Sequence, residues 1–85
     1  MNNSASKGNN TELWEKLLAV LDDKLQLGLL GKLQSVTSYH FENNILYIEP
    51  GSVEDYAYLS KPATFQQLEL FAQDVTKVSA VKLKN

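Results

Sequence analysis

The single histidine of the chain, His40, is the residue type best suited to acid–base chemistry near neutral pH. A catalytic histidine works with a nucleophile or a second titratable group at a recognisable spacing. His40 has no serine, cysteine or histidine partner of that kind, and it falls in a strand-like segment. We therefore expect His40 to be a strand-surface residue, and we expect no catalytic residues and no enzymatic activity in this chain.

Two adjacent carboxylate pairs, Asp22-Asp23 and Glu54-Asp55, are the groups that invite a metal-binding interpretation. A metal site needs ligands that converge from several positions, and neither pair has the alternating spacing of a calcium-binding loop. The chain contains no cysteine, which excludes disulfides and thiolate metal ligands. We predict no metal ligands, no cofactor-binding residues and no cofactor.

The segment Gly28-Leu29-Leu30-Gly31 has the G-x-x-G spacing with which RNA-binding KH domains clamp a nucleic-acid backbone. The two intervening residues are leucines, and only Lys32 supplies a positive charge nearby. We interpret the glycines instead as residues that permit a tight turn between two helices.

Charge and hydropathy narrow the classes of partner. The chain has 8 basic and 10 acidic residues, and every basic residue is a lysine. Without arginine the surface lacks the bidentate forks that recognise guanine edges and phosphates, so we expect no direct nucleic-acid binding. No apolar run approaches the ~20 residues of a membrane-spanning helix, and no signal peptide is apparent. We expect a cytoplasmic protein without a membrane partner.

The length of 85 residues allows one small domain. Residues 1–10 are dominated by Asn, Ser and Gly, and we interpret them as a flexible polar linker or a remnant of recombinant expression. Residues 11–85 form the single folded unit in this interpretation. If the linker is natural, the unit is the carboxyl-terminal module of a longer protein.

The helices are predicted from apolar residues at spacings of three and four. The first helix spans roughly Thr11 to Leu25, and a short second helical turn falls within Gln26–Leu33. A further short helix is expected over Val53–Leu59. Pro62 then suits the first turn of a last helix, whose apolar positions include Phe65, Leu68, Phe71, Ala72 and Val75.

The strands are predicted from alternating patterns. Thr37–Phe41 and Ile45–Glu49 are joined at Asn43-Asn44, and asparagine tolerates the left-handed backbone of a tight hairpin turn. The resulting cross-strand pairs are Tyr39 with Ile48, His40 with Tyr47, Phe41 with Leu46 and Glu42 with Ile45. Val78–Lys84 alternates again and is predicted to be the third strand.

These elements predict an α+β fold of KH-like order, with helices on one face of a three-stranded sheet. The expected core includes Trp14, Leu17, Leu21, Tyr39, Phe41, Leu46, Ile48, Leu68, Phe71, Val81 and Leu83. The sheet face opposite the helices is left to solvent, and it carries the residues with which a protein partner is expected to interact. The candidate interaction residues are His40, Ile45, Tyr47, Glu49, Lys82 and, on the short helix, Tyr58.

In this order of elements the sequence resembles the carboxyl-terminal domain of the gamma/tau subunit of bacterial DNA polymerase III. The resemblance rests on Leu13–Leu18 opening the first helix, the pair Leu29-Leu30 and the strands Ile45–Glu49 and Val81–Leu83. Between the last helix and the last strand a glycine is expected in the family, where this chain has Val75-Thr76-Lys77.

The resemblance implies a non-catalytic module of a clamp-loader subunit that acts in DNA replication by contacting other replisome proteins. Polymerase or helicase subunits, or a second copy of the chain, are the expected partners. The family's ATPase part is not in this chain, which has no P-loop motif. The alternatives are the amino-terminal recruitment domain of the replication initiator DnaA and an RNA-binding KH module.

Overall fold

The computed structural model describes residues 7–84, and residues 1–6 and 85 lie outside the described part. The elements in chain order are α1 (Thr11–Asp23), α2 (Leu27–Gln34), β1 (Ser38–Glu42), β2 (Ile45–Glu49), α3 (Val53–Ser60), α4 (Pro62–Thr76) and β3 (Ala80–Leu83). None of the described helices is both long and apolar enough to cross a bilayer.

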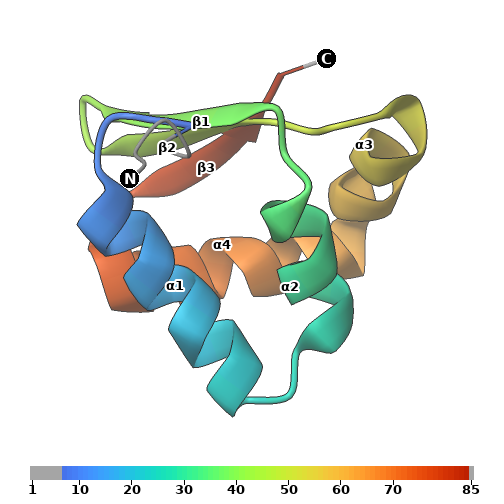
Figure 1. The fold of residues 1–85 in the computed structure, drawn as a ribbon, viewed down its shortest axis with the longest axis horizontal. Helices are drawn as coiled ribbons and strands as arrows, with labels where there is room; N and C mark the ends of the chain where they lie inside the picture. Colours follow the sequence, from blue (N-terminus) through green and yellow to red (C-terminus); the bar gives the residue numbers. More distant parts are fainter. Residues whose placement is uncertain (1–6, 85) are drawn as a thin grey trace, which may run out of the picture.

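The architecture is α+β, as predicted, with the helices gathered beneath one face of a three-stranded sheet in the described part of the chain (Figure 1). The strand order is β1-β2-β3. β1 and β2 are antiparallel, whereas β2 and β3 are parallel. Because a parallel pair needs a long crossover, α3 and α4 connect these two strands, and α4 runs beneath the sheet (Figure 1).

The β1–β2 hairpin confirms the predicted register. Tyr39 pairs with Ile48 and His40 with Tyr47, as the two-residue turn requires. Asn43 and Asn44 form that turn with φ values of 53° and 65°. Both values lie in the left-handed region that a type I′ turn needs at its two central residues, and asparagine reaches this region at little cost.

The turn between α1 and α2 differs from the prediction. α1 ends at Asp23, and Leu25 adopts a left-handed φ of 58°. The Leu25 amide donates to the Asp22 carbonyl at 3.1 Å and the Gln26 amide to the Leu21 carbonyl at 2.8 Å, which is the Schellman pattern of helix termination. A leucine therefore occupies the position where glycine is usual.

The interpretation of Gly28 and Gly31 as turn residues is wrong, because both lie inside α2. The reason is that the Schellman bonds at Leu25 already reverse the chain before the glycines are reached. Gly28 has a different role, since a Cβ atom there would collide with the hydroxyl of Tyr58. It leaves room for the Tyr58 hydroxyl against α2.

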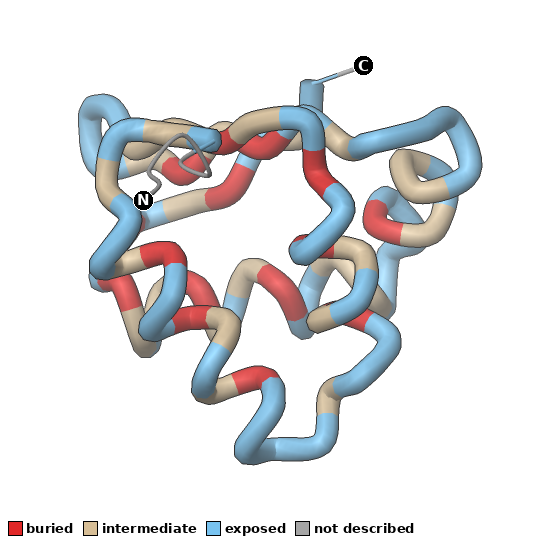
Figure 2. The backbone as a smooth tube through the Cα atoms, viewed as in Figure 1, coloured by how far each residue is buried: buried red, intermediate tan, exposed pale blue. Residues whose placement is uncertain are grey.

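The core lies between the helices and the inner sheet face (Figure 2). Of the predicted core residues, the structure buries Trp14, Leu17, Leu21, Tyr39, Leu46, Ile48, Leu68 and Val81. The other three, Phe41, Phe71 and Leu83, are half-buried and pack against its margin. Leu29, Leu33, Val36, Leu59, Ala72 and Val78 are also buried. Trp14 stacks on Tyr39 with ring centroids 4.2 Å apart, so α1 is anchored directly to the sheet.

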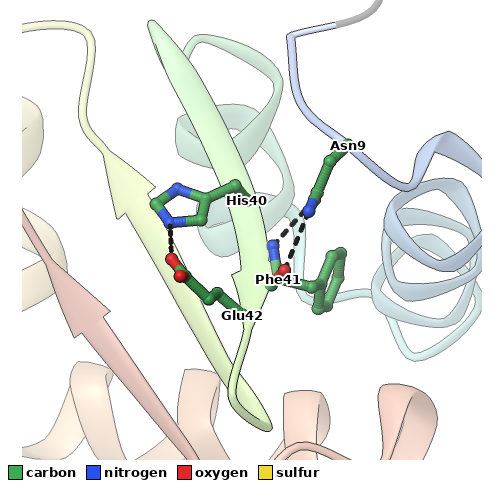
Figure 3. A network of polar contacts seen from close by, with 4 residues as sticks. All are labelled: Asn9, His40, Phe41 and Glu42. Atoms are coloured by element: carbon green, nitrogen blue, oxygen red, sulfur yellow. Dashed lines mark hydrogen bonds and ion pairs between the residues drawn. The ribbon is translucent and has the colours of Figure 1, made fainter.

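The folded unit begins before the predicted boundary at Thr11. The carbonyl of Lys7 accepts a hydrogen bond from the Tyr39 amide at 3.2 Å. The Asn9 side chain both accepts from the Phe41 amide and donates to the Phe41 carbonyl, each at 2.8 Å (Figure 3). Residues 7–9 therefore pair with the edge of β1, and the Asn10 side chain caps α1, so the interpretation of residues 7–10 as a linker is wrong. The rest of the predicted linker, residues 1–6, falls outside the described residues.

Candidate functional site

The sheet face opposite the helices gathers five of the six candidate interaction residues on one surface. Side chains alternate along each strand, so the residues that flank the buried ones point away from the core. We define the open face as Ser38, His40, Glu42, Ile45, Tyr47, Glu49, Ala80 and Lys82. The register aligns His40, Tyr47 and Lys82 in one row across the three strands.

The centre of the open face is an aromatic pair. The rings of His40 and Tyr47 stack with centroids 4.7 Å apart and planes 12° from parallel. His40 Nε2 also lies 3.2 Å from Glu42 Oε1 (Figure 3). Two neighbours thus hold the imidazole in place, and the pair presents a flat, half-buried surface.

The charges on this side of the molecule are segregated. The acidic residues lie on β1 and β2, where Glu42 contacts His40 and Glu49 accepts a 3.1 Å hydrogen bond from the Ser38 hydroxyl. The basic residues are Lys82 on β3 and Lys84 just after it, both exposed. Among the described residues neither lysine forms an ion pair within the chain. Their charges therefore face solvent.

The edges of the sheet are less accessible than its open face. Residues 7–9 cover the edge of β1, as described above. At the edge of β3 the Glu69 carboxylate accepts from the Val81 amide at 3.0 Å, and Gln73 Nε2 donates to the Ser79 carbonyl at 2.8 Å. Since these backbone groups are occupied, a partner strand cannot use them, which favours docking on the face over strand addition.

A cavity of about 250 Å³ continues the open face at one end of the sheet. Its walls are Glu49, Pro50, Ser52, Val53, Tyr56 and Lys84, and we call it the end cavity. Val53 is 84% exposed there, although it is aliphatic. Sequence reasoning missed this cavity because its wall joins a loop to the first turn of α3. The signal that pointed to it was an aliphatic residue placed directly after Pro50-Gly51-Ser52 and outside the helix's apolar stripe.

Tyr58, the sixth candidate residue, lies away from the open face. It is half-buried against the core at the contact of α3 with α2, with its hydroxyl beside Gly28. The Nζ atoms of Lys32 and Lys61 lie 5.3 Å and 5.7 Å from the centre of its ring. The structure therefore separates Tyr58 from the other five candidates.

The arrangement of these groups suits non-covalent binding. Within residues 7–84 no group of three or more His, Asp or Glu side chains is placed to hold a metal ion. In the acidic segment Glu54-Asp55, the Asp55 carboxylate lies 3.0 Å from Lys32 Nζ and forms an ion pair with it. The open face offers aromatic area at its centre, charge at its margins and an apolar cavity at one end.

No protein-family model, no curated protein and no solved structure matches the chain.

Proposed function

We propose that the chain is a non-catalytic protein-interaction module that docks a partner protein on the open face of its sheet. The observation that carries this proposal is the stack of His40 on Tyr47, half-buried at the centre of a face whose neighbouring edges are partly covered. Aromatic side chains held rigid before binding lose little entropy when a partner covers them. They are also the residue class that dominates interface energetics.

The surroundings of this stack fit an interface. Ile45 adds aliphatic area beside Tyr47, and the charges of Glu49 and Lys82 lie around this centre. A central apolar and aromatic patch with a charged rim is the usual anatomy of a protein–protein contact. The rim sets the orientation of the partner, and the end cavity offers a pocket for one of its apolar side chains.

We further propose that this module is the carboxyl-terminal domain of a DNA polymerase III gamma/tau subunit and acts in the cytoplasm in DNA replication. The element order and the helices on one sheet face agree with the KH-like domain that the resemblance implies. Lys77 adds support, because it adopts a left-handed φ of 66° where the family pattern suggests a glycine. The partners are then polymerase or helicase subunits of the replisome.

The two alternatives fit less well. In an RNA-binding KH module the G-x-x-G segment is a loop that faces phosphates, whereas here it is part of α2 and Leu29 is buried. The DnaA recruitment domain is expected to carry an aromatic residue in its second helix, and α2 has none. Binding of single-stranded RNA or DNA at physiological salt, weakening steeply as salt is raised, is the result that favours the nucleic-acid alternative.

The test is capture of partners by the immobilised protein, followed by the same experiment with a His40→Ala/Tyr47→Ala variant. We expect a polymerase or helicase subunit to be retained by the wild type and lost by the variant. The rival explanation is that the stack only favours strand structure. Retention of the same subunit by a folded variant overturns the open face as the site, and failure to retain any replisome subunit overturns the replication assignment.

A further inference from the structure

The segment that precedes α1 lies along a sheet edge and makes the bonds of a paired strand. β1 is an outer strand, so one row of its backbone groups faces away from β2. In this row the Tyr39 amide donates to the Lys7 carbonyl at 3.2 Å. The Asn9 carboxamide accepts from the Phe41 amide and donates to the Phe41 carbonyl (Figure 3). A residue of an antiparallel neighbouring strand exchanges the same two bonds, so the Asn9 side chain takes the place of a backbone partner.

Gly8 shows how closely this segment fits the strand. A Cβ atom at this position would collide with the carbonyl oxygen and the ring of Tyr39, so no larger residue fits here without a shift. Lys7 adds a second attachment, because its Nζ atom donates to the Gln34 carbonyl at the end of α2 at 3.0 Å. Residues 7–9 therefore have a specific seat on β1, and we call them the edge cover.

The edge beneath the cover has the geometry to pair with a copy of itself. Tyr39 and Phe41 direct their amides away from β2, as their bonds to the cover show, and they flank His40. Two antiparallel β1 strands centred on His40 place Tyr39 of each copy opposite Phe41 of the other. Each of these pairs can exchange both of its backbone bonds. The groups that the cover now occupies are thus the groups that this pairing uses.

The side chains of β1 suit the same register. On the inner face it brings Tyr39 opposite Phe41 of the second copy, and aromatic cross-strand pairs are stabilising. On the open face His40 lies opposite His40, and Ser38 lies opposite Glu42 of the second copy. With neutral imidazoles, no like charges meet along the five residues of β1.

We propose that the edge cover is an autoinhibitory contact that prevents β1 from pairing with β1 of a second copy. When the cover is released, two three-stranded sheets join through antiparallel β1 strands centred on His40. Exposed edge strands are the usual sites of such association, and native proteins commonly cover them with a loop. The proposal is independent of the proposed function, because it concerns the edge of the sheet and not a partner on its open face.

The test is the oligomeric state of the full chain after release of the cover. Gly8→Val places a side chain against Tyr39, and Asn9→Ala removes both bonds to Phe41. We expect analytical ultracentrifugation to show a monomer for the wild type. At the same concentration it should show a dimer for the Gly8→Val/Asn9→Ala variant, which we call the uncovered variant.

Two control variants separate release of the cover from other causes. Lys7→Ala loses the bond to Gln34 but keeps the backbone carbonyl that binds Tyr39, so it should remain a monomer. Asn10→Ala removes the side-chain cap of α1 and lowers stability without removing a bond to β1. It should also remain a monomer, because instability alone does not open the edge.

The register is tested by adding the same charge to the uncovered variant at two positions. His40→Lys places two lysines opposite each other at the centre of the pairing, so the dimer dissociation constant should rise about fivefold or more. Ser38→Lys instead places a lysine opposite Glu42 of the second copy. It should leave the dimer intact or tighten it.

Asn9→Asp keeps the test available if the uncovered variant does not fold. It retains Gly8, but its carboxylate cannot donate to the Phe41 carbonyl, so it should also dimerise. Amide hydrogen exchange in the wild type is the second measurement. The Tyr39 and Phe41 amides should be protected by the cover.

Several results overturn the proposal. These are a folded monomer for the variants that release the cover, equal dimerisation of Asn10→Ala, or equal effects of the two lysine substitutions. Unprotected Tyr39 and Phe41 amides in the wild type also overturn it. None of these measurements uses a replisome protein, so failure of this proposal is distinguishable from failure of the proposed function.

Discussion

The open face and the turn between α1 and α2, which we call the helical end, expose their side chains in different ways. On the open face the exposed groups contact one another, as His40 does with Tyr47 and Glu42 and as Ser38 does with Glu49. At the helical end, the side chains of Leu25 and Leu27 are exposed and contribute little to the core. The backbone of Leu25 also adopts a strained left-handed conformation. Exposure is compatible with stability at the first surface and is costly at the second.

The two turns nearest these surfaces show the same contrast. Both use left-handed backbone, with φ values of 53° and 65° at Asn43 and Asn44 and 58° at Leu25. Asparagine tolerates this region and leucine does not. The difference teaches that the hairpin is built from residues that favour it, whereas the α1–α2 turn is imposed by the packing on either side.

The largest expected effect comes from the core that both surfaces share. Trp14 is 6% exposed and stacks on Tyr39, so Trp14→Ala removes the contact that anchors α1 to the sheet. We expect a loss of about 3–5 kcal/mol in the free energy of unfolding, enough to unfold a domain of this size. Urea denaturation followed by circular dichroism measures it. A variant that remains as stable as the wild type contradicts the core assignment.

The next effect separates the two turns directly. Leu25→Gly should raise the free energy of unfolding by about 1 kcal/mol, because glycine adopts the left-handed conformation without strain and little apolar burial is lost. Asn44→Gly, at the same kind of backbone position, should change it by only a few tenths of a kcal/mol. Thermal melts of the two variants measured side by side compare them. Equal effects would remove the contrast between the turns.

A smaller effect is expected beneath the sheet. The hydroxyl oxygen of Tyr39 is buried and has no hydrogen-bond partner among the described residues. Tyr39→Phe keeps the stack on Trp14 and the edge contact with Phe41 but removes the unpaired group. The free energy of unfolding should stay unchanged or rise by up to about 1 kcal/mol. A clear loss in a denaturant titration indicates that the hydroxyl has a partner after all.

The smallest stability effect is expected on the open face. Removing the cross-strand stack with His40→Ala/Tyr47→Ala should cost about 1 kcal/mol or less, the range of a single exposed pair. Circular dichroism should show a native spectrum at room temperature. A variant that unfolds indicates that the stack is a structural requirement and weakens its assignment to binding.

The sequence predicted those parts of the fold in which local chemistry and packing agree. The hairpin register follows from Asn43-Asn44 and from the alternation of Tyr39 and Phe41 with polar residues, and the structure confirms it. The open face follows from the same alternation, so five of the six candidate residues lie together.

Other features depend on contacts between distant segments and were not predictable. The pairing of Asn9 with Phe41 uses a polar side chain in a segment whose composition suggests a linker. The burial of Leu59 and Val36 and the walls of the end cavity arise only once the helices pack. The sequence assigns Tyr58 to the short helix α3, but its contact with α2 depends on the absence of a side chain at Gly28.

The central claim is that the open face, and not the helical end, holds the replisome partner. It is tested most directly by calorimetric titration of that purified partner subunit with the wild type, His40→Ala/Tyr47→Ala and Leu25→Ser/Leu27→Ser. We predict that the open-face variant binds about tenfold or more weakly and that the helical-end variant binds like the wild type. Unchanged affinity for the open-face variant, with its fold intact, contradicts the claim.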